Sequence, residues 1–549
     1  VGPTGSAVPH NLFPYTALFR FPTITDNQAD DSTWYNSDPG AVWDVDFSDP
    51  AGSLLDNVQY TIHTAADLGG AELKAWTDIA SAIGATDFTS EWAIDFSAAT
   101  DGVNFVSARA YDAAGNVSSV ASDVFYFRAD TTVPAVTDNQ ADDNTWYTSD
   151  PGAVWDVDFT DAGGSLLENA QYTMWSGTEF GDSQLKGWTD ITAGIAAASY
   201  TADWAIDFGA ATNGVNYISV RAYDTAGNVS ATATDVFYFK ADKSEPVIID
   251  NQDGDDTWYN ADPGAVFDVD FFDNAGAQLE YTQYTVWSGA SLSGTEIMAW
   301  TDIATGIAAA SYTADWGVDF NSLAGGTNHV SVRAFDESAS VSAVATDVFY
   351  IRKDISLPYI TDNQDGDDAW YNTDPGAAFD VDFFDSGDSL LDRVQYTVWS
   401  GPALSGSETI SWTDITSGIG SATYSSSWGI DFASAAEGTG YVSARAFDNA
   451  GNVSAVATDV FYINKDTVPP AFGGAQSASA NCGSGCIAVS WNSATDTYSG
   501  PVTYNVFSAQ SSGAQGFATP SVTTASTSIT VTALTGGQEY FFVVRAEDS

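Results

Sequence analysis

Acidic residues recur along this chain in sets whose chemistry suits a hard cation. The first member of one set returns in the next after a fixed step (242 − 130 = 112). The four sets are Asp130 with Asp161, Glu168 and Asp224; Asp242 with Asp273, Glu280 and Asp336; Asp354 with Asp385, Asp392 and Asp448; and Asp466 with Asp496 and Asp548. Calcium takes roughly six to eight oxygen ligands, many of them carboxylates. We therefore interpret these sets as candidate calcium sites.

The same acids are compatible with two roles that need no bound ion. Aspartate commonly caps turns while it remains solvated. A very acidic surface also suits a high-salt solvent, and this role predicts aspartates on strand faces as well, as at Asp156 and Asp158. The acidic loop that begins at Asp250 lacks the full pattern of an EF-hand.

Residues for acid–base or nucleophilic catalysis are scarce. The only histidines are His10, His63 and His329, none of which recurs at the repeat step. Carboxylate pairs are so numerous that any glycosidase-like spacing can arise by chance. We expect this chain not to be an enzyme.

A second recurring group is aromatic. If Ile218, Val220 and Ala222 face a core, alternation along the strand places Tyr217, Arg221 and Tyr223 together outside, with Trp175 on the strand expected alongside. The equivalent sets are Phe105, Arg109, Tyr111 and His63; His329, Arg333, Phe335 and Trp287; and Tyr441, Arg445, Phe447 and Trp399. Such a face indicates either a cross-strand ladder that stabilises the sheet, which we favour, or a stacking platform for a glycan.

The two cysteines, Cys482 and Cys486, are separated by Gly-Ser-Gly. A disulfide that closes so small a ring stabilises by about 2 kcal/mol and indicates an oxidising compartment. The alternative is a pair of free thiols in a flexible loop. A zinc site is not expected, because no further cysteine or nearby histidine completes a ligand set.

The element that must position these groups is a repeated unit. A predicted hairpin from Val220 to Ser230 recurs with its arginine at Arg109, Arg221, Arg333 and Arg445, again at one step (221 − 109 = 112). A unit of this length can bury its own core, so the chain is a string of domains. The repeats cover 20–131, 132–243, 244–355 and 356–467. Prolines at the seams favour short, extended linkers that restrict the angle between neighbours.

Alternating apolar residues and turn residues predict the strands of one unit. In the second repeat these are 135–140, 145–147, 153–159, 170–176, 200–208, 215–224 and 235–240, with no amphipathic helix. Seven short strands in about a hundred residues are typical of a Greek-key β-sandwich. In that topology the loop after the second strand and the turn of the penultimate hairpin lie at the pole where the preceding domain enters. The acids of each set are therefore expected to meet at a seam.

The hairpin V-x-R-A-Y/F-D-x-A-G-N-V-S, followed by a terminal strand and a proline, resembles the bacterial immunoglobulin-like repeats of large surface proteins. The resemblance covers four units and implies an all-β fold, a tandem array of immunoglobulin-like Greek-key β-sandwiches. The third repeat departs from the motif between Asp336 and Ser340, where Gly-Asn is missing, so its turn is expected to differ.

Residues 468–549 follow another pattern. The segments 487–491, 502–508 and 534–548 resemble a fibronectin type III domain, with Gly536 in place of the proline of that family's tyrosine corner. We expect this domain to be truncated at its C-terminus and to present an unpaired sheet edge. At the other end, residues 1–19 are expected to be a non-native or unstructured leader, because 9–20 resemble a translated sequencing adapter.

The net negative charge of the chain excludes some classes of binding partner. With 15 Lys and Arg against 73 Asp and Glu, a formal charge of −58, nucleic acid and anionic membranes would be repelled. No apolar run reaches transmembrane length. We expect an extracellular or cell-surface structural and adhesive stalk with an unknown protein or glycan as surface ligand. The alternative is a carbohydrate-binding accessory region of a secreted polysaccharide-degrading enzyme.

Overall fold

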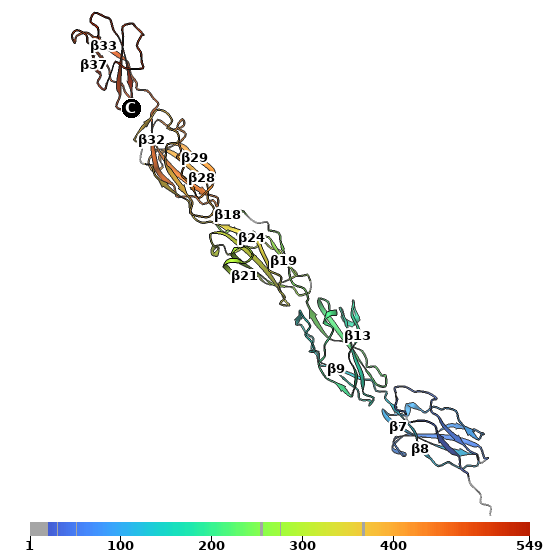
Figure 1. The fold of residues 1–549 in the computed structure, drawn as a ribbon. Helices are drawn as coiled ribbons and strands as arrows, with labels where there is room; N and C mark the ends of the chain where they lie inside the picture. The colour runs from blue at the N-terminus through green and yellow to red at the C-terminus, as the bar shows by residue number, and fades with distance from the viewer. Residues whose placement is uncertain are drawn as a thin grey trace, which may run out of the picture.

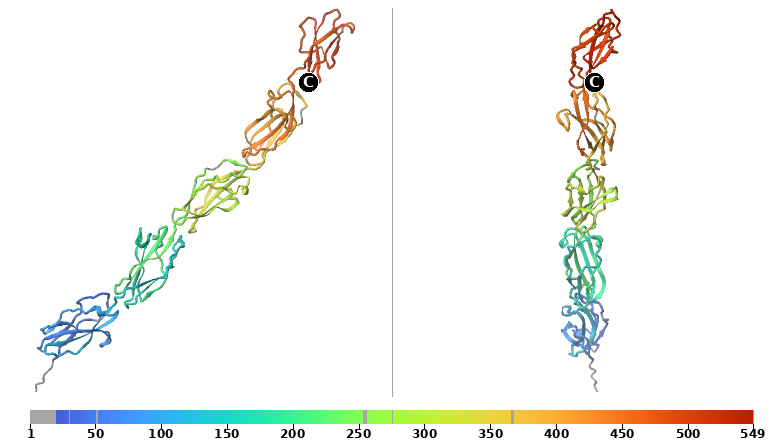
Figure 2. Two further views of the ribbon diagram at one scale, coloured as in Figure 1. Left: turned by 180° about the vertical axis from the view of Figure 1, so that it is seen from behind. Right: turned by 90° about the vertical axis from the view of Figure 1, so that its left-hand side faces the viewer.

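The computed structural model describes residues 20–29, 31–50, 52–252, 256–274, 276–364 and 368–548, so the predicted leader lies outside the described residues. Five domains follow one another in a single elongated row, with the C-terminus in the last of them (Figures 1 and 2). No helix among the described residues is long and apolar enough to cross a membrane.

Each of the first four domains is a two-sheet sandwich, and the second shows the plan. Its small sheet has the order β14-β11-β9, and its large sheet has the order β10-β16-β15-β12-β13. The short strand β10 runs parallel to β16, and the other neighbours are antiparallel. The elements are β9 (Ala135–Asp138), β10 (Trp146–Tyr147), β11 (Val157–Thr160), β12 (Leu167–Trp175), η2 (Thr178–Phe180), β13 (Gln184–Ala197), β14 (Ser199–Tyr200), η3 (Phe208–Ala210), β15 (Gly214–Asp224) and β16 (Ala233–Ala241).

The other three domains repeat this plan. The first has β1 (Thr23–Asp26), β2 (Trp34–Tyr35), β3 (Val45–Ser48), β4 (Leu55–Ala65), β5 (Gly69–Ser81), β6 (Asp87–Phe88), η1 (Phe96–Ala98), β7 (Gly102–Asp112) and β8 (Ala121–Ala129). The third has β17 (Val247–Asp250), β18 (Trp258–Tyr259), β19 (Val269–Phe272), β20 (Leu279–Gly289), β21 (Ser293–Ala309), β22 (Ser311–Tyr312), η4 (Phe320–Ser322), β23 (Gly326–Asp336) and β24 (Ala345–Lys353). The fourth has β25 (Tyr359–Asp362), β26 (Trp370–Tyr371), β27 (Val381–Phe384), β28 (Leu391–Gly401), β29 (Ser405–Ser421), β30 (Thr423–Tyr424), β31 (Gly438–Asp448) and β32 (Ala457–Lys465).

Every repeat has a hydrophobic core of its own. In the second repeat Trp155 stacks on Phe237 with ring centroids 4.6 Å apart, between the two sheets. The inward face of β15 is the predicted one, since Ile218, Val220 and Ala222 are fully buried. The repeats are therefore separate sandwiches, as the sequence indicates.

For the second repeat one strand prediction is wrong and one strand was not predicted. The segment 200–208 is not a continuous strand: β14 ends at Tyr200, Trp204 makes an isolated bridge to Trp155, and η3 follows. The long strand β13 was not predicted. Its pairing with β12 shifts register at several bulges, which break the strict alternation of apolar and polar residues that reveals a strand.

The hairpin turn of the third repeat keeps the common conformation, contrary to the prediction from its sequence. The Asp336 N–H donates to the Ser340 carbonyl at 3.2 Å, as the Asp224 N–H does to the Asn228 carbonyl. Ala339 adopts φ 64° where Gly227 has φ 89°. An alanine here carries the steric cost of the left-handed region, about 1–2 kcal/mol, and the surrounding turn holds it there.

The fifth domain is a smaller sandwich of two three-stranded sheets, β33-β34-β37 and β36-β35-β38. Its strands are β33 (Ala475–Ser479), β34 (Ile487–Trp491), β35 (Thr503–Ala509), β36 (Val522–Thr524), β37 (Ser528–Val531) and β38 (Phe541–Glu547). The Tyr540 hydroxyl accepts the Thr535 N–H at 2.8 Å, which forms the expected tyrosine corner. Within the described residues β38 pairs only with β35, so its other edge has no neighbouring strand there.

Candidate metal centres at the domain seams

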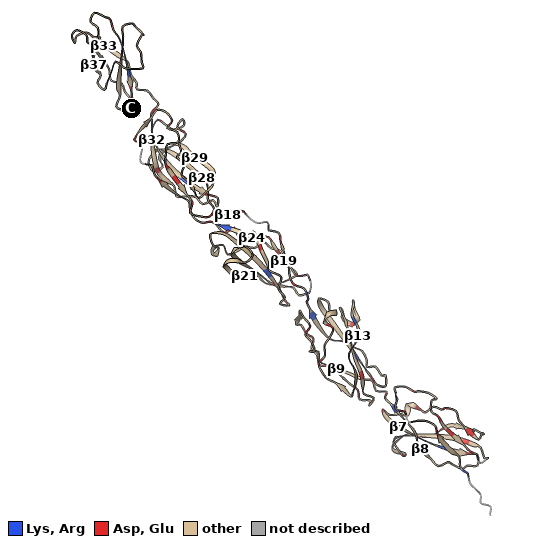
Figure 3. Ribbon diagram, viewed as in Figure 1, with Lys and Arg blue, Asp and Glu red and all other residues tan. Residues whose placement is uncertain are grey.

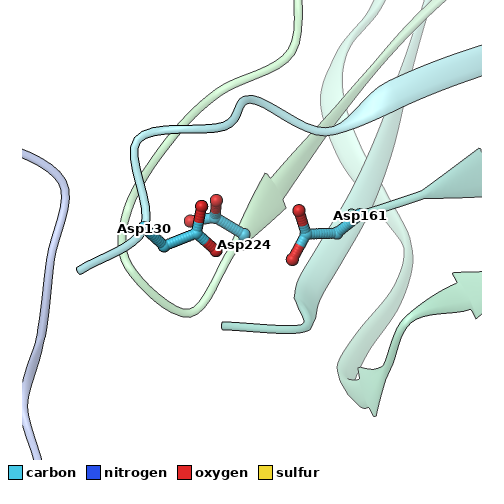
Figure 4. Close-up of side chains that lie close together, drawn as sticks. All are labelled: Asp130, Asp161 and Asp224. Carbon is cyan, nitrogen blue, oxygen red and sulfur yellow. The ribbon is translucent and has the colours of Figure 1, made fainter. Parts of the chain in front are cut away.

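Three aspartates meet wherever one repeat follows another. The first seam has Asp130, Asp161 and Asp224, the second has Asp242, Asp273 and Asp336, and the third has Asp354, Asp385 and Asp448. In each seam the three residues offer carboxylate oxygens that all lie within 4.8 Å of one another, and all three residues are buried. Figure 4 shows the side chains of the first seam converging from three separate segments.

The first residue of each seam belongs to the linker and is anchored in both domains. Asp130 follows β8, and its backbone N–H donates to the Tyr35 carbonyl of its own domain at 3.0 Å. Its Oδ1 accepts the Thr132 N–H at 3.0 Å. Its Oδ2 accepts the Ser165 N–H of the next domain at 2.9 Å. The hydrogen bonds of Asp130 therefore join the two domains.

The second residue leaves an oxygen without a donor. Asp161 follows β11, and its Oδ1 accepts the Gly163 N–H at 3.0 Å. Its Oδ2 is buried and has no hydrogen-bond partner, and the same holds for Oδ2 of Asp385 in the third seam. The hydroxyl oxygens of Ser165 and Ser389, which border these groups, are also buried without a partner. Buried polar atoms are rarely left unpaired, because desolvation without a new bond is costly.

The third residue ends the penultimate strand of each repeat. Asp224 accepts the Asn228 N–H on Oδ1 at 2.8 Å and the Asn228 side-chain amide on Oδ2 at 2.7 Å. The same amide nitrogen donates to the backbone carbonyl of Asp130 at 2.9 Å. Asn452 makes the equivalent contacts with Asp448 and Asp354. Asn228 and Asn452 are therefore lock residues that tie the hairpin turn to the preceding linker.

Glycine makes room for the linker carboxylate. A Cβ on Gly163 would lie 1.9 Å from Oδ1 of Asp130, and a Cβ on Gly387 would lie 2.1 Å from Oδ2 of Asp354. The hairpin motif placed the lock residues in a turn and indicated no contact with the linker, and these glycines had no expected role. They recur at twice the repeat step (387 − 163 = 224 and 452 − 228 = 224), whereas the intervening positions 275 and 340 hold Ala and Ser, and this pattern was the signal that could have found them.

The electrostatics of the seams favour a cation. Burial first, and the neighbouring seam carboxylates second, raise the pKa of Asp224 and of Asp448. Burial likewise raises the pKa of Asp336 and Asp385, each beside the linker aspartate of its seam. In the first seam no ion pair compensates the three carboxylates among the described residues. A hard cation with oxygen ligands would supply the missing positive charge.

The remaining predicted acids lie elsewhere. Glu168 and Glu280 are exposed and Asp392 is half-buried, and none of them belongs to the three-carboxylate groups. Each follows a fully buried leucine, so the pleat of the strand turns it away from the core face. In the fourth seam Asp466 is buried and Asp496 and Asp548 are half-buried, with the Ser499 N–H donating to Oδ2 of Asp466 at 3.0 Å.

The predicted aromatic face exists, with a partner that sequence analysis missed. Trp175 lies in register with Tyr217 on the neighbouring strand. The Arg221 guanidinium lies 4.1 Å from the ring centroid of Trp188 and 5.2 Å from that of Tyr223, and its Nε donates to Gln171 at 2.9 Å. Arg109, Arg333 and Arg445 contact Trp76, Trp300 and Trp412 in the same way. The tryptophan comes from β13, the strand whose alternation is broken.

The two cysteines are joined. Cys482 and Cys486 form a disulfide with a Cα–Cα distance of 5.7 Å, in the loop between β33 and β34. His63 and His329 lie on the outer aromatic face of their sheets, paired in register with Phe105 and Trp287.

Comparison with known proteins finds similar solved structures of tandem domains. No family model matches the chain, and no curated protein matches it. Similar structures include a tetra-tandem repeat in the extending region of a large adhesion protein, 19% identical, covering 81% of this chain and 99% of that chain, with a TM-score of 0.32. Another is the protocadherin gammaB7 EC3-6 cis-dimer, 13% identical, covering 80% of this chain and 100% of that chain, with a TM-score of 0.29.

A third similar structure contains fibronectin(III)-like modules of Clostridium thermocellum CbhA, 12% identical, covering 40% of this chain and 95% of that chain, with a TM-score of 0.16. Scores this low carry no argument about function. The fold follows from strand order alone: a three-stranded sheet against a five-stranded one, with a parallel edge strand and a Greek-key path. The chain is a tandem array of four immunoglobulin-like β-sandwiches followed by a fibronectin type III-like domain.

Proposed function

We propose that this chain is a non-catalytic extracellular stalk in which calcium at the domain seams holds neighbouring sandwiches in line. A stalk of this kind acts through its length and its outer faces, and it keeps an adhesive or other distal part away from the surface that carries it. Its ligand would be a protein or a glycan on an opposing surface.

The observation that carries the proposal is the pair of buried carboxylate oxygens without a donor, Oδ2 of Asp161 and Oδ2 of Asp385. Each belongs to a group of three carboxylates with oxygens within 4.8 Å of one another. Ionised carboxylates at such distances repel, and burial strengthens the repulsion. A bound cation would offset the repulsion and would give the unpartnered oxygen a favourable contact.

Calcium suits these seams better than magnesium does. The ligands available in the first seam are three carboxylates and the Ser165 hydroxyl, spread over two domains. Magnesium demands a near-ideal octahedron and gives up its water reluctantly, whereas calcium accepts irregular sets of oxygens. The linker residues Asp130 and Asp354 would hold the ion from one side of the seam, and the other two aspartates from the far side.

Shape and charge support the stalk. Five domains lie end to end, each with a separate core (Figure 1). A strand of ten residues rises about 34 Å, so five such domains would span on the order of 170 Å. Acidic residues outnumber basic ones 73 to 15, and both are scattered along the rod (Figure 3). Like charge of this magnitude favours an extended, soluble molecule.

Calcium titration of the full chain tests the proposal. We expect the midpoint of thermal unfolding to rise between excess EGTA and millimolar calcium, since an ion that binds only the folded state stabilises it, by about 2.7 kcal/mol at a hundredfold excess over Kd. Magnesium at the same concentration is expected to act more weakly. Asp161→Asn and Asp385→Asn should each lower the number of ions bound in calorimetric titration. No shift at millimolar calcium would reject the proposal.

The carbohydrate-binding alternative has one supporting feature, the row of rings on the large sheet. Arg221 already occupies the faces of Trp188 and Tyr223, and the equivalent arginines do the same in the other repeats. A sugar would have to displace these contacts. We therefore assign the rings to stabilisation of the sheet, and glycan-array binding by the full chain that Trp399→Ala abolishes without unfolding would reverse this assignment.

A further inference from the structure

The three seams between repeats differ in how they are held. The first and third seams contain the lock residues Asn228 and Asn452, whose amides donate to the preceding linker carbonyl at 2.9 Å. The second seam has Ser340 at this position (340 − 228 = 112). Ser340 Oγ lies 3.0 Å from Ser338 Oγ in its own turn, and no hydrogen bond joins it to the preceding linker among the described residues.

The residues that flank this turn also differ between the seams. In the first seam Asn36, from the domain before the seam, lies against Gly227, so that a Cβ there would be 3.5 Å from its Nδ2. Asn260 lies against Gly451 in the third seam. The second seam has Thr148 and Ala339 at these two positions (148 − 36 = 112; 339 − 227 = 112), and both border a hollow of about 310 Å³ together with Asp242 and Ser340, among others.

The donors around Asp336 in the second seam reach only one of its two oxygens, since Oδ1 accepts the N–H groups of Ser338 and Ser340 and the Ser338 hydroxyl. In the first seam the amide of Asn228 donates to Oδ2 of Asp224, which spreads part of that negative charge over a donor. In the second seam Asp336 is fully buried, and its Oδ2 has no hydrogen-bond partner. Across this seam the Ala277 N–H donates to Oδ2 of Asp242 at 2.9 Å, and Gly276 packs against Gly214, where an added Cβ would lie 2.8 Å from the Gly214 nitrogen.

We propose that the second seam is the cation-dependent joint of the rod: when the ion leaves, the second and third repeats swing relative to each other, while Asn228 and Asn452 keep the first and third seams aligned. Calcium concentration then sets the stiffness of the rod at one internal position instead of along its whole length. The inference rests on the proposed calcium binding, and its test separates the two.

Equivalent exposed positions allow a matched measurement. Ala75, Gly187, Ala299 and Ser411 occupy one place on the exposed edge strands of successive repeats. Cysteine pairs at 75 and 187, at 187 and 299, and at 299 and 411 span the first, second and third seams of the full chain. Spin labels attached without reducing agent leave the Cys482–Cys486 disulfide intact. Pulsed electron–electron distance measurements then report the width of each distance distribution in calcium and in EGTA.

In calcium we expect three narrow distributions. In EGTA the second-seam pair should broaden by about twofold relative to the other two, because that seam lacks the hydrogen bond from a lock residue to the linker carbonyl. Ser340→Asn, combined with Ala339→Gly to replace the left-handed alanine by the glycine of the other turns, should narrow the second-seam distribution in EGTA. Asn228→Ser should broaden the first-seam distribution in EGTA and leave it narrow in calcium.

Each remaining outcome overturns the inference in a distinguishable way. If all three distributions broaden equally in EGTA, calcium acts at every seam and the second seam is not special, which leaves the proposed function standing. If no distribution responds to calcium, the proposed function and the inference both fail. If Ser340→Asn with Ala339→Gly folds and leaves the width unchanged, the lock residues do not set the stiffness.

Discussion

The Asp130 carboxylate and the Ser165 backbone N–H belong to different domains and are joined by a hydrogen bond of 2.9 Å. Asp354 and Ser389 repeat this contact at 2.8 Å. Since the backbone N–H of the same aspartate is tied to its own domain, one residue is fixed from both sides. The orientation of neighbouring repeats therefore depends on a few polar contacts rather than on a shared hydrophobic core.

Gly163→Ala should disrupt the first seam. The added Cβ would lie 1.9 Å from Oδ1 of Asp130, so the carboxylate must move away from the Ser165 N–H. We expect the unfolding free energy to fall by about 1–3 kcal/mol, as for overpacking of a filled site, and calcium binding at this seam to weaken in calorimetric titration. Gly187→Ala is the control, because its Cβ meets no atom within 4 Å. An unchanged calcium affinity in Gly163→Ala would contradict the role given to Asp130.

Acid should stabilise the seams when calcium is absent. Burial raises the pKa of Asp224 in the folded chain, so its contribution to stability is complete below the pKa of the unfolded chain and is lost as pH rises through the folded pKa. Asp336 and Asp448 behave alike. In EGTA, lowering the pH from 7 toward 5 should therefore raise the unfolding midpoint of the native chain relative to Asp224→Asn, which has no proton to gain.

In EGTA the stabilisation of the seams should grow as pH falls, whereas the stabilisation by calcium should shrink as pH falls. Protons and the ion compete for the same carboxylates, so the calcium-induced shift in the unfolding midpoint should shrink as pH falls. The measurement is the difference in midpoint with and without calcium at each pH. A difference that is constant between pH 7 and 5 would place the bound ion away from Asp224, Asp336 and Asp448.

Much of the fold could be read from the sequence because its signals are local and repeated. Alternation along 215–224 predicted the buried face of β15, and the step between equivalent arginines predicted a tandem array of similar sandwiches. The convergence of the linker aspartate with two others followed from topology, which fixes the pole of a sandwich where loops meet. Glu168 was placed in the same group because chain order says little about which way a strand-end side chain points.

The contacts that distinguish one seam from another could not be predicted in this way. Asn228 was explained as a turn residue, and its side-chain bond to the Asp130 carbonyl joins positions 98 residues apart. The missing Gly-Asn in the third repeat was seen, but its consequence was assigned to the turn. The turn tolerates the change, because Ala339 adopts the left-handed conformation, and the seam is what loses a contact.

Lys353→Met should destabilise the third repeat. The ammonium is nearly buried and donates to the carbonyls of Phe320, Asn321 and Leu323 at 2.8, 3.2 and 2.9 Å. Methionine keeps much of the volume but removes the ammonium donor from all three carbonyls, of which only that of Phe320 is also shown accepting a backbone N–H, from Leu323 at 3.3 Å. We therefore expect a loss of about 2–4 kcal/mol. Thermal unfolding of the full chain should show one domain melting earlier. Arg352→Met, at the neighbouring and more exposed position, should have a smaller effect.

The converse substitution should stabilise the first repeat. Ala129 occupies the position of Lys353 two repeats earlier (353 − 129 = 224). The short 3-10 turn whose carbonyls accept from Lys353 has a counterpart in the first repeat. The residues that precede these two turns have similar backbone angles, with φ and ψ of −78° and 86° at Asp95 and −68° and 88° at Asp319. Ala129→Lys should therefore place an ammonium among the carbonyls that follow Asp95 and raise the melting of the first repeat. A lower melting temperature would show that the first repeat has no room for the side chain.

Trp188→Ala should reveal what the aromatic face does. The Arg221 guanidinium lies 4.1 Å from the Trp188 ring centroid, and a cation–π contact that is partly desolvated contributes about 0.5–2 kcal/mol. We expect the unfolding free energy to fall by this amount and, in addition, by the contribution of the ring's packing against the sheet. Chemical denaturation of the full chain measures the total. Trp188→Phe, which keeps a ring, should recover part of it. The loss should be matched by Trp412→Ala, because Arg445 lies 4.2 Å from that ring. A folded Trp188→Ala chain of native stability would mean that the arginines are held by their glutamine partners alone, and the half-buried rings would then need another purpose, such as contact with a sugar.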